Sequence, residues 1–225
     1  VLDKVELYEV SWGPQIYIGE YKGQKVFLAS ASVGSGSGLM FTELYAAGAE
    51  YIIRYGSDDV KSPQAYEKGI IKIIDETDNL YGFARASAVP EAEWGKSIFA
   101  SPELLKALRD EAKARKLGVE VRVCHHLENY HALRTPQRFS PERRRILEDR
   151  LAKLKRKDKK ESFDMESAVL FRVAKDCGKH AAAVLQTVNK EDPKLGAYEG
   201  KNKEESLKME AMFIDYVLSA LFRNK

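Results

Sequence analysis

The chain has 225 residues, of which 44% are hydrophobic and 32% are charged, and its formal net charge is +3. This length suffices for one domain with a large buried core, and the small net charge gives no general argument for nucleic acid as a partner. Because no apolar run reaches the ~20 residues of a membrane helix and no signal peptide opens the chain, we expect a cytoplasmic protein that does not bind a membrane.

Strand patterns alternate with glycine-rich turns in the first quarter of the chain. The turn Gly34–Gly38 separates a strand from a helix that is expected to end at Gly48. The order strand, glycine turn, helix, strand is typical of a parallel sheet covered by helices. The predicted strands are residues 5–10, 16–21, 25–30 (a buried strand) and 51–57, and the predicted helix is 39–47.

The rest of the chain continues the alternation and shows no internal repeat or linker. Ser101 and Asp164 are predicted N-caps, and Gly118 and Gly178 are predicted to end the two helices that they open. One α/β domain over residues 1–225 is therefore expected. The predicted strands are 69–75, 119–126 and 181–188, and the predicted helices are 102–116, 164–177 and 203–222, with a solvated amphipathic helix within 141–160.

Polar residues follow four of these strands, and ligands bind at such strand ends in open α/β sheets. The first place is Ser30–Gly38, whose backbone amides suit an anion or a sugar hydroxyl. It lacks the lysine of a nucleotide-binding P-loop, and its glycine spacing differs from that of dinucleotide-binding proteins. A ligand loop and a plain tight turn both remain open from these residues.

The second place is Arg54-Tyr55-Gly56-Ser57. An arginine inside an apolar strand needs a partner, and a phosphate matches its planar guanidinium, with Ser57 as a further donor. An internal salt bridge, for instance to Glu43, would satisfy Arg54 equally well.

The third place is Cys124-His125-His126, followed by His131. Three histidines in a short stretch suggest a metal, but a strand sends His125 and His126 to opposite faces, and no carboxylate has the matching spacing. We therefore predict no metal site. Cys124 and Cys177 are the only cysteines; each lies in an apolar segment and is expected to be a reduced core residue.

The fourth place is Phe163-Asp164-Met165-Glu166 at the start of a predicted helix, with Thr187–Lys190 after the next strand. Two carboxylates and a thioether would suit a sugar, because a fixed anion accepts hydrogen bonds from vicinal hydroxyls and sulfur packs under the ring. Acidic residues at a helix start are also ordinary caps, so this stretch alone leaves both interpretations open.

Taken in order, these four places resemble the nucleoside phosphorylase family, and its uridine phosphorylase branch in particular. Segment 163–168 resembles the family's ribose-binding Glu-Met-Glu, with Asp164 in place of the first glutamate. Segment 53–57 resembles its phosphate-binding Arg-x-Gly-Thr/Ser turn, and 31–36 is similar to its glycine-rich loop. Val188-Asn189-Lys190 resembles the Val-Asn-Arg of uridine phosphorylases.

The resemblance implies a mixed central β-sheet flanked by helices on both faces and a homo-oligomer built from dimers, up to a hexamer. It implies cleavage of a pyrimidine nucleoside by inorganic phosphate as co-substrate, without a cofactor. Arg54 and Glu166 would be catalytic. Phosphate would contact Arg54, Ser57 and Gly34, ribose would contact Met165 and Glu166, and the base would contact Phe163, Asn129, Tyr130, Gln137 and Arg138.

The chain departs from the family pattern around the phosphate. No Gly-Asp-Pro-x-x-Arg loop precedes Val5, and Tyr8–Trp12 lacks the arginine that a neighbouring subunit commonly contributes. Asp58 and Asp59 are expected to oppose a phosphate by roughly 4 kcal/mol each at ~4 Å. These departures leave two alternatives: a phosphate-independent nucleosidase, although Lys190 stands where hydrolytic relatives have an aspartate, or a catalytically impaired nucleoside-binding or assembly homologue.

Overall fold

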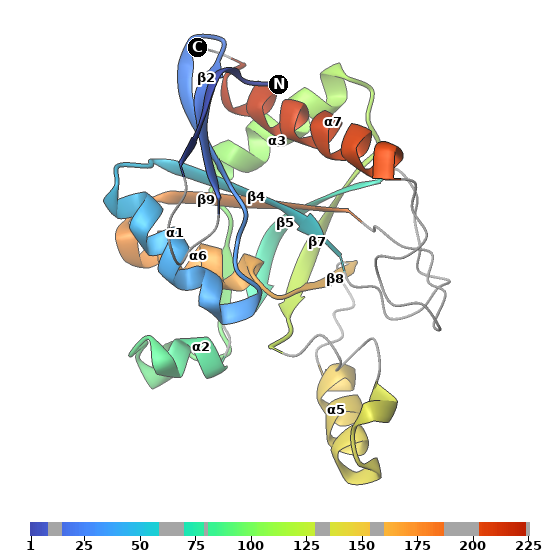
Figure 1. The fold of residues 1–225 in the computed structure, drawn as a ribbon. Helices are drawn as coiled ribbons and strands as arrows, with labels where there is room; N and C mark the ends of the chain where they lie inside the picture. Colours follow the sequence, from blue (N-terminus) through green and yellow to red (C-terminus); the bar gives the residue numbers. More distant parts are fainter. Residues whose placement is uncertain are drawn as a thin grey trace.

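The computed structural model describes residues 1–8, 15–58, 70–78, 81–128, 136–153, 160–186 and 203–223. Within these residues the centre of the molecule is a six-stranded sheet whose strands run in the order β4-β9-β5-β7-β8, with β6 paired to β5 (Figure 1). The strands are β4 (Tyr51–Ser57), β5 (Ile71–Asp78), β6 (Ser97–Phe99), β7 (Val119–His126), β8 (Glu161–Asp164) and β9 (His180–Gln186).

The central sheet is mixed. Strand β9 is parallel to β4 but antiparallel to β5, whereas β5, β7 and β8 are parallel to one another. The mixed sheet expected from the family resemblance is confirmed, and the purely parallel sheet expected from the order of elements is wrong. Strand β9 reads as one continuous apolar run because it is buried along almost its whole length.

Helices cover both faces of this sheet (Figure 1). On one face α1 packs against α6, and α6 lies on β9, β7 and β5; on the other face α3 packs against α7. Leu170 of one layer and Phe213 of the other belong to one shared hydrophobic core. The helices are α1 (Ser37–Ala46), α2 (Tyr81–Ala86), α3 (Pro102–Ala114), α5 (Pro141–Lys153), α6 (Ser167–Cys177) and α7 (Lys203–Leu221), with 3-10 turns η1 (Gly34–Gly36), η3 (Glu91–Glu93) and η4 (Pro136–Arg138).

A separate three-stranded antiparallel sheet stands beside α7 and consists of β1 (Asp3–Tyr8), β2 (Ile16–Tyr21) and β3 (Gln24–Ala29). Its contact with the body is a small apolar cluster of Tyr21, Val26 and Leu218. The strand predicted at residues 25–30 is confirmed as β3, but its predicted burial is wrong. Val26 is buried but Phe27 is 45% exposed, because successive residues of a strand face opposite sides and only one side meets α7.

The predicted helix caps and helix ends are confirmed in part. Ser101 is the N-cap residue of α3 as predicted, but its hydroxyl makes no capping hydrogen bond and instead accepts one from the Ala181 amide at 3.0 Å. Asp164 is the last residue of β8, so α6 begins three residues later than predicted. Gly178 ends α6 in the left-handed conformation as predicted, with φ 62°. Cys177, the last residue of α6, is exposed, so its prediction as a core residue is wrong.

None of the helices in the described part of the chain combines the length and the apolar character that crossing a membrane requires.

Candidate functional site

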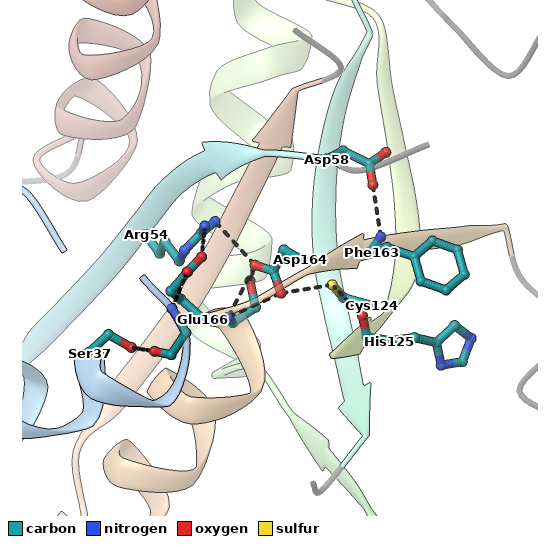
Figure 2. A network of polar contacts seen from close by, with 10 residues as sticks. Ser37, Arg54, Asp58, Cys124, His125, Phe163, Asp164 and Glu166 are labelled. Atoms are coloured by element: carbon teal, nitrogen blue, oxygen red, sulfur yellow. Dashed lines mark hydrogen bonds and ion pairs between the residues drawn. The ribbon is translucent and has the colours of Figure 1, made fainter. Parts of the chain in front are cut away.

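Arg54 of β4 lies against the two carboxylates that flank Met165. Its Nη2 donates a hydrogen bond to Glu166 Oε2, and its Nη1 lies 3.2 Å from Asp164 Oδ2 (Figure 2). Arg54 thus has an internal salt bridge, as one of the two open interpretations expected, but its partners are Asp164 and Glu166 and not Glu43. Strands β4 and β8 stand at the two ends of the sheet, so this contact requires the sheet to curl until its ends approach.

The Arg54 guanidinium is almost completely enclosed. Its side chain is 11% exposed, and those of Asp164 and Glu166 are 1% and 10% exposed. Burial by itself would lower the pKa of Arg54, but Asp164 and Glu166 outweigh that effect and raise it. Arg54 is therefore a fixed cation that faces two anions.

Gly56 makes room for this arrangement. A Cβ atom added at Gly56 would lie 1.8 Å from Nη1 of Arg54 and 2.3 Å from Cζ. The guanidinium thus folds back along β4 over the one residue that has no side chain. Glycine in a strand often marks such a close approach, and here it fixes the direction in which Arg54 points.

The glycine-rich turn reaches the same place. The Gly34 amide donates a 2.7 Å hydrogen bond to Glu166 Oε1, and the Gly34 carbonyl accepts one from the Ser37 hydroxyl at 2.7 Å (Figure 2). Gly34 has φ +69°, which favours glycine, and Met165 Cε would lie 3.5 Å from a Cβ added there. The predicted residues Gly34, Arg54, Met165 and Glu166 are therefore brought together.

The Asp164 carboxylate accepts hydrogen bonds from several donors. It accepts from the Ser167 amide at 3.1 Å, from the Ser167 hydroxyl, and from Cys124 Sγ at 3.3 Å. It thus satisfies the first turn of α6 from a position three residues ahead of the helix. Burial, followed by the neighbouring Asp164 charge, raises the pKa of Cys124, so the thiol stays protonated and donates. The predicted burial of Cys124 is confirmed.

Asp58 belongs to a second buried ion pair and not to the phosphate surroundings that the sequence predicted. Its Oδ2 pairs with Nζ of Lys72, whose side chain is fully buried, and its Oδ1 accepts a 2.8 Å hydrogen bond from the Phe163 amide. Lys72 thus pairs with the carboxylate that was expected to oppose a phosphate. Sequence reasoning missed Lys72, although a lysine inside Ile70-Ile71-Lys72-Ile73-Ile74 signals a buried carboxylate partner.

The two adjacent histidines point to opposite faces of β7, as predicted. His125 Nδ1 lies 2.7 Å from Asp78 Oδ2, and its ring packs beside that of Phe163 at a centroid distance of 5.4 Å. Figure 2 shows the rings of His125 and Phe163 pointing away from Arg54 and Glu166. Nε2 of the buried His126 lies 3.4 Å from Glu128. In the described ranges, no group of three His, Cys, Asp or Glu side chains has metal-binding geometry.

The other predicted site residues are only partly placed. Ser57 is half-buried and is the last residue of β4. Gln137 and Arg138 are exposed in η4. The predictions for Asp59, Asn129, Tyr130, His131 and Thr187–Lys190 fall outside the described residues.

Comparison with known proteins gives a family and a fold. The family model described as "Phosphorylase superfamily" matches residues 1–223. A uridine phosphorylase from Vibrio fischeri ES114, solved with 6-hydroxy-1-naphthoic acid, is 20% identical; the match covers 98% of this chain and 81% of that one, with a TM-score of 0.67. A purine nucleoside phosphorylase from Toxoplasma gondii, solved with immucillin-H, is 18% identical over 97% and 82% of the chains, with a TM-score of 0.75. None of the curated proteins matches the chain.

The close approach at Gly56 predicts that Gly56→Ala breaks the contact between Arg54 and Glu166, because a methyl group and the guanidinium cannot occupy the same space. A crystal structure of the variant would show the Arg54 side chain displaced. Gly118→Ala is the matched control, since a Cβ at Gly118 has no neighbour within 4 Å. A Gly56→Ala structure with Arg54 unmoved would contradict the account.

The buried pair predicts that Lys72→Met destabilises the protein by about 3–5 kcal/mol, because Asp58 then loses its nearest cation and keeps a buried charge with Arg122 only at 3.9 Å. Denaturant unfolding measures the loss. Adding Asp58→Asn should restore part of it, whereas removing the exposed Lys106 of the Lys106–Asp110 pair should cost at most about 0.5 kcal/mol. Equal effects of Lys72→Met and Lys106→Met would show that the buried pair is not required.

Proposed function

Because the chain belongs to the phosphorylase superfamily, we propose that it is a nucleoside phosphorylase. It would cleave the N-glycosidic bond of a nucleoside with inorganic phosphate and give the free base and ribose 1-phosphate. One observation carries this proposal: Arg54 and Glu166, 112 positions apart in the sequence, touch beside the Gly34 turn. This contact supports adjacent places for a phosphate ligand and a sugar ligand.

Glu166 supplies the chemistry that the ribose needs. Its carboxylate accepts hydrogen bonds from sugar hydroxyls and favours the positive charge that the ribose gains while the glycosidic bond breaks. The Gly34 amide donates a hydrogen bond to one oxygen of Glu166, and Arg54 donates one to the other oxygen. Met165, whose methyl group lies beside Gly34, offers a polarisable surface under the sugar ring.

Arg54 and Ser57 would orient phosphate for attack on the anomeric carbon, which is catalysis by positioning and not by a covalent intermediate. In this structure Glu166 occupies one edge of the guanidinium, so phosphate has to take that edge from it. Phosphate is well suited to do so, because it offers two parallel charge-assisted hydrogen bonds in place of one. Glu166 is then released towards the ribose.

A nucleosidase, with water in place of phosphate, is the second candidate. It is favoured by the two carboxylates around Arg54, because Asp164 and Glu166 together exceed the single positive charge and leave this cluster with an excess negative charge. Such a cluster resists an anion more than it resists water.

The finer assignments rest on the sequence resemblance. Val188-Asn189-Lys190 and the pair Gln137-Arg138 support a pyrimidine base such as uracil and a role in pyrimidine salvage. The resemblance also assigns Asn129 and Tyr130 to the base; the Phe163 ring that it assigns there is buried beside His125 and points away from Arg54 and Glu166. The proposal also includes a dimer-based homo-oligomer in the cytoplasm that uses no cofactor beyond inorganic phosphate.

Glu166→Gln tests the sugar-binding role. We expect kcat to fall at least a hundredfold, since an amide does not favour the developing positive charge, while the fold persists because Asp164 still pairs with Arg54. Release of uracil from uridine measures turnover, and the circular dichroism spectrum checks the fold. Glu161→Gln, in the same strand-to-helix segment, is the control. Unchanged turnover in Glu166→Gln would remove Glu166 from the mechanism.

Omitting phosphate separates the candidates. A phosphorylase releases base only when phosphate is present, and Arg54→Lys should then raise the KM for phosphate about tenfold or more, because the second parallel hydrogen bond is lost. Base release that proceeds equally without phosphate would identify a nucleosidase. Binding of uridine without turnover in either condition would identify an impaired homologue.

A further inference from the structure

A second hydrogen-bonded group adjoins the proposed site and has no role in the chemistry described above. The hydroxyl of Ser35, the residue after Gly34, donates a 2.6 Å hydrogen bond to Glu128 Oε1. The same carboxylate oxygen lies 3.4 Å from Nε2 of His126. Ser35 thus links the glycine-rich turn to the end of β7.

His126 is fixed in place by its position in the sheet. In the register between β7 and β8 it lies opposite Asp164, so both side chains emerge on the same face of the sheet. Its side chain is fully buried, and Glu128 is the charged group within reach of its Nε2. A buried imidazole therefore lies 3.4 Å from the half-exposed Glu128 carboxylate.

Glu128 is further confined by α2. A Cβ added at Gly82 would lie 3.3 Å from Glu128 Oε1, which is closer than ordinary contact, so the carboxylate rests against the bare backbone of that helix. Three elements therefore meet at one carboxylate: the turn η1 through Ser35, β7 through His126 and α2 through Gly82.

We propose that Glu128 is a positioning residue that, through Ser35, holds the Gly34 amide against Glu166 and so sets the carboxylate that receives the ribose. The inference rests on the proposed function, because Glu166 is assigned there to the sugar. Neighbouring residues of a turn move together, so an anchor at Ser35 restricts the amide one residue earlier. Glu166 would then meet the ribose already oriented.

The charge state of Glu128 agrees with this role. The nearby His126 ring, and then the hydrogen bond from Ser35, lower the pKa of Glu128. Glu128 is therefore an anion at neutral pH and accepts a charge-assisted hydrogen bond, which is stronger than a neutral one. The hydroxyl of Ser35, next to Gly34, donates that hydrogen bond and so ties the turn to Glu128.

The test compares Glu128→Ala, Ser35→Ala, the double variant and Ser35→Thr, which keeps the hydroxyl. We expect faster hydrogen exchange of the Gly34 amide in the first three, and a nucleoside KM raised about threefold to tenfold, as for the loss of one hydrogen bond. The KM for phosphate should change less than twofold. The double variant should resemble either single variant, and Ser35→Thr should resemble the wild type.

Glu91→Gln, an exposed glutamate of η3, controls for loss of surface charge. Unchanged exchange at Gly34 in Glu128→Ala overturns the inference whether or not the protein is a phosphorylase. Equal rises in the KM for nucleoside and for phosphate also overturn it, since general loosening would cause that. Wild-type protein that neither cleaves nor binds a nucleoside overturns the proposed function, and in that case the exchange rates alone decide whether Glu128 anchors the turn.

Discussion

Burial of the Arg54 guanidinium is the constraint from which the rest of the site follows. A charge at that depth needs compensation, and Asp164 and Glu166 provide it from the junction between β8 and α6. Meeting them requires the sheet to curl, Gly56 to leave space, and the Gly34 turn to hold the second oxygen of Glu166. The same requirement places a cation and an anion side by side, which is what joining a phosphate to a sugar demands.

Much of this could be predicted from the sequence because the relevant signals are local. An arginine in an apolar strand indicates an anionic partner, and a Met-Glu pair at a helix start suggests a sugar-binding site. The order of four such segments identified the family, and membership of the phosphorylase superfamily confirms that prediction. The bounds of β4 and β7 and the end of α6 at Gly178 were predictable because they depend on neighbouring residues alone.

What the sequence did not predict depends on contacts between distant segments. Asp58 was interpreted as a charge facing phosphate. Its neighbours in the sequence do not show that Lys72 of β5 pairs with it. Cys177 was assigned to the core from the apolar residues around it, although the last turn of α6 faces solvent there. The strand that carries Phe27 was predicted to be buried, since a strand's pattern does not reveal which layer covers it.

The central claim is that Arg54 and Glu166 form one site for a phosphate and a sugar. A crystal structure of the protein with ribose 1-phosphate tests it most directly. The account predicts phosphate oxygens on the Arg54 guanidinium and ribose hydroxyls on Glu166, with the direct contact between the two side chains replaced by the ligand. Ribose 1-phosphate bound at another place, with Arg54 still paired to Glu166, would contradict it.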